Sequence, residues 1–280
     1  MSFDRVTVVG AGRVGLSLAR ALVHTGRSVL VVSRRSRTLP DPLDAATLDL
    51  QAAMRQADLI IVAVPDDALS GVATTMSRGD ALSARHVVLH TSGLHDRSIL
   101  SPLAPSGAAL GSWHPLQTFA LPVGEPAALA GSPVAIEGDA RALDAGRGLA
   151  SLLHLRPVIE LSAEGKARYH AGAVFASNYL VVLADIAARL ARDAGANSAS
   201  AGLFLPLMRR SLANYSAGGA NTLTGPISRG DAGTVARHLE ALHGADRELY
   251  VALGREALRL AKAAGLPEGK ADAIATLLAS

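Results

Sequence analysis

The sequence predicts an α/β fold, with an N-terminal doubly wound parallel sheet followed by an all-α C-terminal domain. Three observations lead to this prediction. Short apolar runs alternate with helical patterns over residues 1–161, as in parallel sheets. A glycine-rich run follows the first of them. From residue 162 to residue 280 the chain shows long Ala- and Leu-rich segments and no convincing strand pattern. We therefore predict two domains, 1–161 and 162–280.

The strands are expected at short apolar runs that are rich in β-branched residues. The run at 58–64, DLIIVAV, lacks polar alternation, which is typical of a strand buried on both faces of a parallel sheet. The predicted strands are Arg5–Val9, Val29–Val32, Asp58–Val64, His86–His90, Ala108–Ser112, Val134–Ile136 and Val158–Leu161.

The helices are expected where apolar residues recur at helical spacing. Over Arg13–Thr25 they fall on one face, and Gly26 follows as a C-terminal cap. The other predicted helices are Asp66–Met76, Ala140–His154, Ala163–Ala194, Ser198–Ser216, Asp231–Leu242, Gly244–Ala264 and Gly269–Leu278.

Composition excludes several classes of function. The chain has no Cys, which excludes disulfides and thiolate chemistry, and it has no H-E-x-x-H run, so no metal is predicted. With 27 basic and 24 acidic residues and no interleaved aromatics, nucleic-acid binding is not expected. Neither a signal peptide nor an apolar run near the roughly 20 residues of a membrane span is predicted. We expect a soluble, cytoplasmic protein.

The glycine-rich run is a dinucleotide-binding fingerprint. Gly10, Gly12 and Gly15 form a G-x-G-x-x-G pattern between a strand and a helix. Gly10 allows the tight turn, Gly12 lets a pyrophosphate approach, and Gly15 lets helix and strand pack closely. Arg13 and Val14 open the helix, whose free N–H groups attract phosphate. The alternative is a turn that merely uses glycine.

The second strand ends in residues that favour NADP(H) over NAD. NAD-binding folds place an Asp or Glu about 20 residues beyond the fingerprint, and here that place falls on Ser33. Arg34 and Arg35 follow it and can pair with a 2′-phosphate. The alternative is a solvated arginine loop.

Three motifs carry a resemblance to known proteins. DLIIVAVPDDAL, HTSG and GSWHPLQTF resemble the cofactor half of the 6-phosphogluconate dehydrogenase-like superfamily, which includes ketopantoate reductases, pyrroline-5-carboxylate reductases and prephenate dehydrogenases. With YHAGAVFASNYLV and LTGPISRGD, the whole chain resembles a Rossmann-like family with a C-terminal domain of unknown function. Some members of that family act as ketopantoate reductases.

The resemblance implies a place for each motif. Val64 and Pro65 would border the nicotinamide ribose, and Thr91 and Ser92 would follow a strand at the ligand-binding edge of the sheet. His114 could face the substrate. The helical domain would resemble the C-terminal domain of 6-phosphogluconate dehydrogenase, and two subunits would pack through it as a homodimer.

Relatives in the superfamily use a Lys and an Asn on the first long helix of the second domain. Asn178 resembles that Asn, but Val174 stands four residues earlier, where the Lys would be. His170 and Ser177 share a helical stripe with Lys166. We assign His114, His170, Asn178 and Ser92 as candidate catalytic residues.

Each candidate has a structural alternative. Helix capping or bonding to another subunit is the alternative for His170, Ser177 and Asn178. His114 could bond a loop, and Ser92 could cap a helix or serve a turn. His90, which ends a buried strand, is expected to be a satisfied core histidine.

Ser177, Asn221 and Arg229 are candidate substrate-binding residues. Arg229 could clamp a carboxylate or pair with Asp231, which could itself cap the next helix.

These observations predict an NADP(H)-dependent oxidoreductase. The expected substrate is a small carboxylate-bearing carbonyl, such as a ketopantoate-like 2-oxo acid, or an imine. The alternative is a catalytically inactive protein that binds or senses NADP(H), suggested by Val174 in the place of the Lys. A purely structural module does not account for the fingerprint.

Overall fold

The computed structural model describes residues 3–36, 38–44, 46–119, 129–196 and 202–279. The chain forms two compact units, Met1–Leu180 and Val181–Ser280, and each is described by itself. The boundary between these units lies within a helical region, after the position at which the sequence analysis divides the domains.

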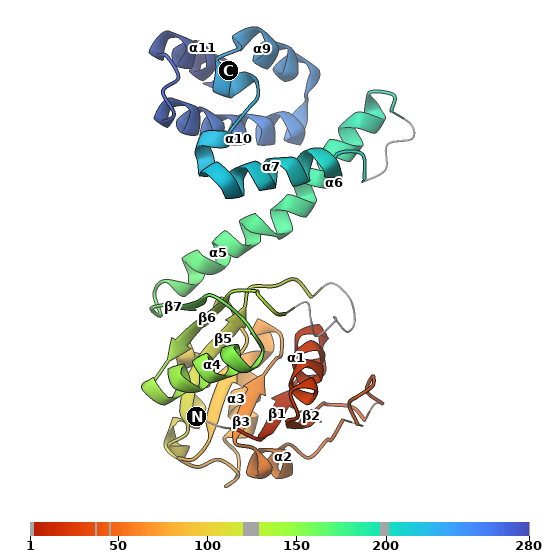
Figure 1. The fold of residues 1–280 in the computed structure, drawn as a ribbon, viewed down its shortest axis with the longest axis vertical. Helices are drawn as coiled ribbons and strands as arrows, with labels where there is room; N and C mark the ends of the chain where they lie inside the picture. The colour runs from red at the N-terminus through yellow and green to blue at the C-terminus, as the bar shows by residue number, and fades with distance from the viewer. Residues whose placement is uncertain (1–2, 37, 45, 120–128, 197–201, 280) are drawn as a thin grey trace. The chain divides into compact units, whose positions relative to one another are not determined.

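The first unit is built on a seven-stranded sheet with the order β2-β1-β3-β4-β5-β6-β7 (Figure 1). The pairings are parallel except that β6 runs antiparallel to β5. The prediction of a parallel sheet is thus confirmed apart from this one reversal. The strands are β1 (Arg5–Val9), β2 (Ser28–Val32), β3 (Leu59–Val62), β4 (Val87–His90), β5 (Ala109–Pro115), β6 (Val134–Gly138) and β7 (Val158–Glu160).

Helices cover both faces of this sheet, which makes it doubly wound. On β3, Leu59 and Ile61 pack into the core shared with α1 and α4, whereas Ile60 and Val62 pack into the core shared with α2, α3 and η1. The apolar run of β3 is therefore buried on both faces, as predicted. The helices are α1 (Arg13–His24), α2 (Leu50–Gln56), α3 (Asp66–Met76), the 3-10 helix η1 (Arg97–Ser106) and α4 (Ala140–Leu152).

The described residues after β7 form helices joined by turns, and the second unit has its own small core. That core includes Ile227, Val235 and Ile274. The helices are α5 (Lys166–Ala176) and α6 (Asn178–Asp193), then α7 (Leu205–Gly218), the 3-10 helix η3 (Gly219–Thr222), α8 (Pro226–Arg229), α9 (Ala232–Ala241), α10 (Gly244–Ala263) and α11 (Glu268–Ala279).

Several predicted elements differ from the observed ones. The single helix expected over Ala163–Ala194 is interrupted at Ser177, whose φ of −123° and ψ of −68° are not helical. The helices α2 and η1 were not predicted because one is a single short segment and the other contains two prolines. The predicted start of a helix at Ser198 lies outside the described residues.

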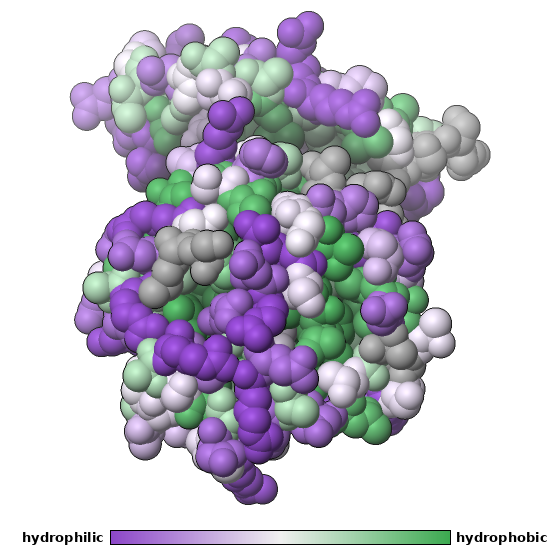
Figure 2. All heavy atoms as spheres, turned by 60° about the horizontal axis from the view of Figure 1, so that its bottom comes forward, coloured by the Kyte–Doolittle hydropathy of each residue, from purple (hydrophilic) through white to green (hydrophobic). Residues whose placement is uncertain are grey.

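One stretch corrects the expectation about membrane spans. Lys166–Asp193, 28 residues with the break at Ser177, is long and apolar enough to cross a membrane by length and composition, and only 6% of its most apolar window is buried. Such a match is weak evidence by itself. Apolar side chains also reach the surface elsewhere, as the green atoms among purple ones show (Figure 2).

Candidate active site

The carboxyl ends of four mutually parallel strands meet at one edge of the sheet. These are β1, β3, β4 and β5, which end at Val9, Val62, His90 and Pro115. The chain reverses its direction of winding between β1 and β3, and open α/β sheets bind ligands at such a switch point. The predicted site residues of the first unit that follow these strands therefore lie at the same edge of the sheet.

The three fingerprint glycines have different surroundings. Gly10 has a φ of +117°, which favours glycine, and a Cβ there would overlap the carbonyl oxygen of Ala63. A Cβ on Gly15 would overlap the carbonyl oxygen of Gly10, so helix and strand touch at this point. A Cβ on Gly12 would meet nothing within 4 Å. The fold therefore requires glycine at positions 10 and 15, and leaves open space beside Gly12.

The start of α1 suits an anion. Gly12 is its N-cap, no side chain caps the helix, and its first turn contains no acidic residue. Its first N–H groups and its dipole are thus directed at the space beside Gly12. These residues fit the diphosphate of a dinucleotide.

The end of β2 lies next to the glycine turn. The amide of Gly10 donates to the carbonyl oxygen of Val32 at 2.9 Å, and Ser33 follows directly. The Oγ of Ser33 accepts a hydrogen bond from the amide of Arg35 at 3.3 Å. Arg34 and Arg35 are exposed, and neither guanidinium has an ion pair with the described part of the chain. Both cations are available to a ligand.

His90 holds the loop that follows β4. Its ring is fully buried, and its Nδ1 accepts from the amide of Ser92 at 3.2 Å while its Nε2 lies 3.1 Å from the carbonyl oxygen of Asp96. This arrangement requires a neutral ring with the proton on Nε2. Burial, and then the charge of Lys166, lower the pKa of His90 to about 4. It is the satisfied core histidine that the sequence predicts.

The hydroxyl of Ser92 serves the same loop. Its Oγ accepts from the amides of Leu94 and His95, both at 3.1 Å. The structural alternative for Ser92 is therefore present in the fold. Its role toward a substrate remains a prediction.

His114 and His170 meet at Gly93, although one is on β5 and the other on α5. Their ring centroids are 5.9 Å apart and the rings are nearly perpendicular. A Cβ on Gly93 would lie 2.7 Å from Cδ2 of His170 and 3.0 Å from Nε2 of His114. Only glycine lets the backbone approach both rings this closely. The structure thus brings together two of the candidate catalytic residues.

Tyr169 completes this cluster and was not identified from the sequence. Its hydroxyl lies 3.4 Å from Nδ1 of His114, with the two rings edge to face. The only signal was its place beside His170 in the YHAG motif. Burial raises the pKa of Tyr169, so its hydroxyl stays protonated.

The ring of His114 is uncharged at neutral pH. Burial lowers the pKa of His114 to about 4, with smaller contributions from the nearby charges of His170 and Lys166 and an opposing one from Asp66. His114 therefore offers the N–H of a neutral imidazole rather than an imidazolium. The N–H of His114 and the hydroxyl of Tyr169 are therefore neutral donors.

A lysine lies beneath the cluster. Lys166 is only 1% exposed, and its Nζ donates to Oγ of Ser112 at 2.6 Å and to the carbonyl oxygen of Ser92 at 3.2 Å. Burial lowers its pKa to about 8, against the opposing charges of Glu137, Asp96 and Asp66. The sequence placed Lys166 on the stripe of His170, but did not indicate that it would be buried.

Other candidates occupy different positions. The Oγ of Ser177 donates to the carbonyl oxygen of Ala173 at 2.7 Å and lies 2.9 Å from Oδ1 of Asn178, so Ser177 has the capping contacts of its structural alternative. Asn178 is exposed at the start of α6, about 12 Å along the helical path from His170 at 1.5 Å per residue.

Two candidates lie in the second unit. Asn221 and Arg229 are both exposed, in η3 and at the end of α8. Asp231 accepts from the amide and hydroxyl of Thr234, at 3.0 and 2.7 Å, and so caps α9 as one alternative predicted.

No group of three or more potential metal ligands is found among the described residues.

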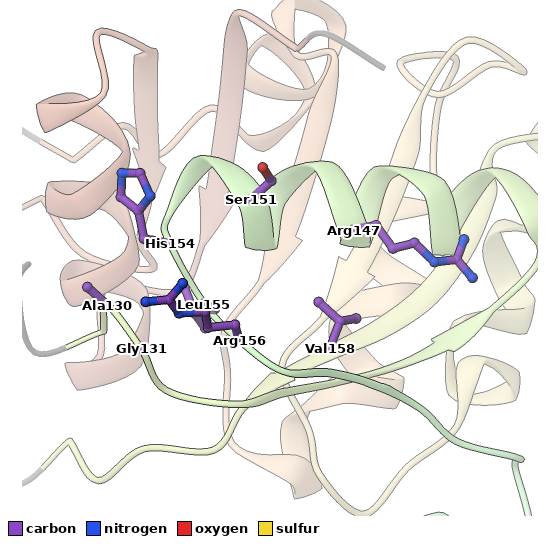
Figure 3. A pocket seen from close by; sticks show the side chains of 8 residues that line it. All are labelled: Ala130, Gly131, Arg147, Ser151, His154, Leu155, Arg156 and Val158. Atoms are coloured by element: carbon purple, nitrogen blue, oxygen red, sulfur yellow. The ribbon is translucent and has the colours of Figure 1, made fainter.

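A cavity of about 650 Å³ lies elsewhere in the first unit, beside α4 and β7. Figure 3 shows that Arg147 and Arg156 in its lining point in opposite directions. Arg147 is already paired with Asp144 at 3.0 Å and Glu160 at 2.6 Å. Its lining contains none of the residues predicted for the cofactor or the chemistry, and we do not assign it to the reaction.

Comparisons with protein families match both parts of the chain. A Rossmann-like domain matches residues 3–115, and the domain of unknown function DUF2520 matches residues 132–278. No curated protein matches the sequence. The resemblance noted in the sequence is confirmed at the level of family.

Solved structures share the fold at low sequence identity. A Bacteroides fragilis protein, provisionally assigned as an NADP oxidoreductase, has a TM-score of 0.68 and 22% identity, covering 93% of this chain and 97% of its own. A Thermotoga maritima protein has a TM-score of 0.67 and 23% identity, covering 92% and 98%. An Aspergillus terreus reductive aminase, in complex with NADPH and ethyl-5-oxohexanoate, has a TM-score of 0.62 and 16% identity, covering 99% and 93%.

The pKa of His90 predicts loss of stability in acid. Because the pKa is about 4 in the folded chain against 6.5 in the reference state, the unfolded chain binds the extra proton between these values. Stability is then lost as the pH falls from about 6.5 through 4, by about 3 kcal/mol for this group. Urea unfolding at each pH, followed by the fluorescence of Trp113, the single tryptophan, measures this loss in the free energy of unfolding.

The comparison is with His90→Gln, which keeps polar atoms at the site but does not titrate. We expect the free energy of unfolding of this variant to fall less between pH 7 and pH 4. His24→Gln, at an exposed histidine, is the control and should behave as the original chain. Parallel pH curves for His90→Gln and the original chain would contradict the prediction.

Proposed function

Since this chain belongs to the DUF2520 family, whose name assigns no activity, we propose from its site that it is an NADP(H)-dependent oxidoreductase. The proposed substrate is a small carboxylate-bearing carbonyl, such as a ketopantoate-like 2-oxo acid, or an imine. One observation carries the proposal. The fingerprint turn at Gly10–Gly15 and the cluster of His114 and His170 follow parallel strands to the same edge of one sheet.

The cofactor would be held by the residues at the switch point. The open space beside Gly12 and the uncapped start of α1, with Arg13 and Val14 in its first turn, fit the diphosphate. Ser33, Arg34 and Arg35 would hold the 2′-phosphate, because guanidinium groups pair with phosphate through paired hydrogen bonds.

The nicotinamide end would lie toward β3 and β4. Val64, Pro65 and Thr91 follow these strands at the ligand-binding edge and would border the nicotinamide and its ribose. When bound, the reduced cofactor supplies a hydride.

The residues of this chain would hold the acceptor and move the proton. His114 or His170 would give the proton to the reduced oxygen or nitrogen, from a ring N–H. If the donor is the neutral ring of His114, its Nε2 would lose the proton as Nδ1 takes the proton of the Tyr169 hydroxyl, 3.4 Å away, and Tyr169 would regain a proton from solvent. Ser92 and Asn178 would position the acceptor, and Ser177, Asn221 and Arg229 would contact the substrate, with Arg229 binding its carboxylate.

We further propose a homodimer through the C-terminal helices. The second unit exposes large apolar side chains on α6 and α7, among them Val181 at 70%, Leu207 at 64% and Tyr215 at 64%. Apolar surface of this kind marks an interaction site, and a second copy of the chain would cover it. Sedimentation velocity tests the stoichiometry, and a monomer at micromolar concentration would contradict it.

A second candidate function is an inactive protein that binds or senses NADP(H). Val174 stands where relatives carry a Lys, and this departure favours it. It shares the cofactor site with the first proposal, so only turnover separates the two.

Gly12→Ala tests the cofactor site. Because a Cβ at this position meets nothing within 4 Å, we expect the free energy of unfolding to stay within about 0.5 kcal/mol of the original value. The methyl group would occupy the space proposed for the diphosphate, so NADPH affinity should fall at least about tenfold. Calorimetry measures the affinity. Gly71→Ala on α3, equally open, is the control, and unchanged affinity in Gly12→Ala would count against the site.

Replacing both Arg34 and Arg35 by Ala tests cofactor choice. The double variant should lose about tenfold or more in NADPH affinity, the effect of roughly 1.4 kcal/mol, while NADH affinity changes little because NADH lacks the 2′-phosphate. Equal losses for both cofactors, or a tenfold preference for NAD in the original chain, would contradict the choice of NADP(H).

Turnover tests the reaction. NADPH oxidation should be measurable with at least one member of a panel of 2-oxo acids and cyclic imines, and His114→Asn and His170→Asn should lower kcat by about a hundredfold or more if either donates the proton. Tight NADPH binding without turnover of any member would leave the sensing protein as the better description.

A further inference from the structure

We propose that Lys166 is a positioning residue, whose buried ammonium group fixes the backbone of Ser92 and Gly93 against the rings of His114 and His170. The inference rests on the proposed function only in calling this cluster the reaction site. The contacts themselves join three separate parts of the first unit: α5, the middle of β5 and the loop after β4.

Lys166 acts as a tether, because its hydrogen bonds connect α5 to β5 and to the loop after β4. Nζ donates to Oγ of Ser112 on β5 at 2.6 Å and to the carbonyl oxygen of Ser92 at 3.2 Å. Ser92 immediately precedes Gly93, against which both rings pack. Lys166 is also one helical turn before His170 on α5, so it fixes the end of the helix that carries this ring. The side chain of Lys166 therefore sets the position of the Gly93 backbone and of the ring of His170, which are in close contact.

The burial of a cation at this place needs an explanation other than stability. Lys166 is 1% exposed and has no ion pair with the described residues. A buried charge without a direct counter-ion destabilises a fold, and an apolar side chain of similar volume is often better tolerated. A hydrogen-bonded cation adds what an apolar chain cannot supply, namely fixed donors and a local positive potential.

The nearest opposite charges are not in contact with it. Glu137 on β6, 7% exposed, accepts from the amide of Arg97 at 2.7 Å, and Asp96 and Asp66 contribute from a loop and from α3. The positive potential therefore extends toward the cluster. Burial, then the charge of His170 and then that of Lys166 lower the pKa of His114, against the opposing charge of Asp66.

This potential suits the chemistry of a reduction. A carbonyl oxygen gains negative charge as hydride arrives, and fixed donors and cations near such an atom stabilise the transition state. Lys166 would act through the loop and through its field, without touching the substrate. It would also add to the effect of burial, which keeps His114 neutral, so that this ring can serve as a hydrogen-bond donor or acceptor beside Tyr169.

The test is Lys166→Met, which keeps the length of the side chain and removes its charge and donors. Imidazole signals in NMR, assigned with His114→Gln, give the pKa of His114 without cofactor or turnover. We expect that pKa to rise by about one unit, since a nearby positive charge has been removed. Lys262→Met, at an exposed lysine of the second unit, is the control and should leave it unchanged.

Kinetics provide the second measurement. In Lys166→Met, kcat should fall about tenfold or more while NADPH affinity stays within about twofold, and the acidic limb of the pH profile should move upward with the pKa of His114. Lys166→Arg retains the charge and should keep the pKa of His114 low. A folded Lys166→Met chain with an unchanged His114 titration overturns the proposal.

Ser112→Ala decides the matter if Lys166→Met fails to fold. This variant keeps the cation and removes the acceptor of the 2.6 Å hydrogen bond. Displaced NMR signals of Gly93 and of both rings support the tether, and unchanged signals overturn it. Because the NMR measurement needs no substrate, absent turnover in the original chain would sink the proposed function and leave this inference standing. If the original chain turns over substrate but the titration of His114 is unchanged in Lys166→Met, this inference fails and the proposed function stands.

Discussion

The close packing of two imidazole rings on the backbone of Gly93 is the contact on which the rest of the site depends. It requires a residue without Cβ at the turn after β4, because any methyl group would lie within 3.0 Å of both rings. It also requires β4 and β5 to run parallel, so that the loop after one strand and His114 near the end of the other reach the same edge. His90, Ser92 and Lys166 then hold the loop from three directions. The position of this site is therefore set by the pairing of the strands rather than by the loop alone.

The electrostatic arrangement follows from that packing. Burial keeps His90 and His114 neutral, while a lysine behind them carries the charge. Neutral donors at His114 and Tyr169, with the buried cation of Lys166 nearby, favour an acceptor that becomes negative during the reaction more than one that is negative at the start.

The sequence predicted the parts that depend on local pattern. The alternation of strands and helices, the buried run of β3 and the roles of Gly10 and Gly15 in the turn all appear in the structure. The sequence did not predict the contacts between segments that are far apart in the chain. Lys166 and Ser112 are 54 positions apart, and nothing in either neighbourhood indicates that a lysine would be buried there. Tyr169 was missed for the same reason, since its importance comes from His114, 55 positions away.

The helical stretch that starts at Lys166 shows how one segment can serve two environments. Its first turn is fixed by the hydrogen bonds of Lys166 to Ser92 and Ser112, and its next carries His170 to Gly93. Farther along, Phe175 is 68% exposed and Val181 70%. Insertion of the whole stretch into a membrane would require these buried polar contacts to break, whereas a second copy of the chain could cover the apolar part and leave them intact. The buried polar contacts lie at the start of α5, whereas the exposed apolar side chains begin near its end at Phe175, so the polar start of the stretch does not depend on whatever covers its apolar end.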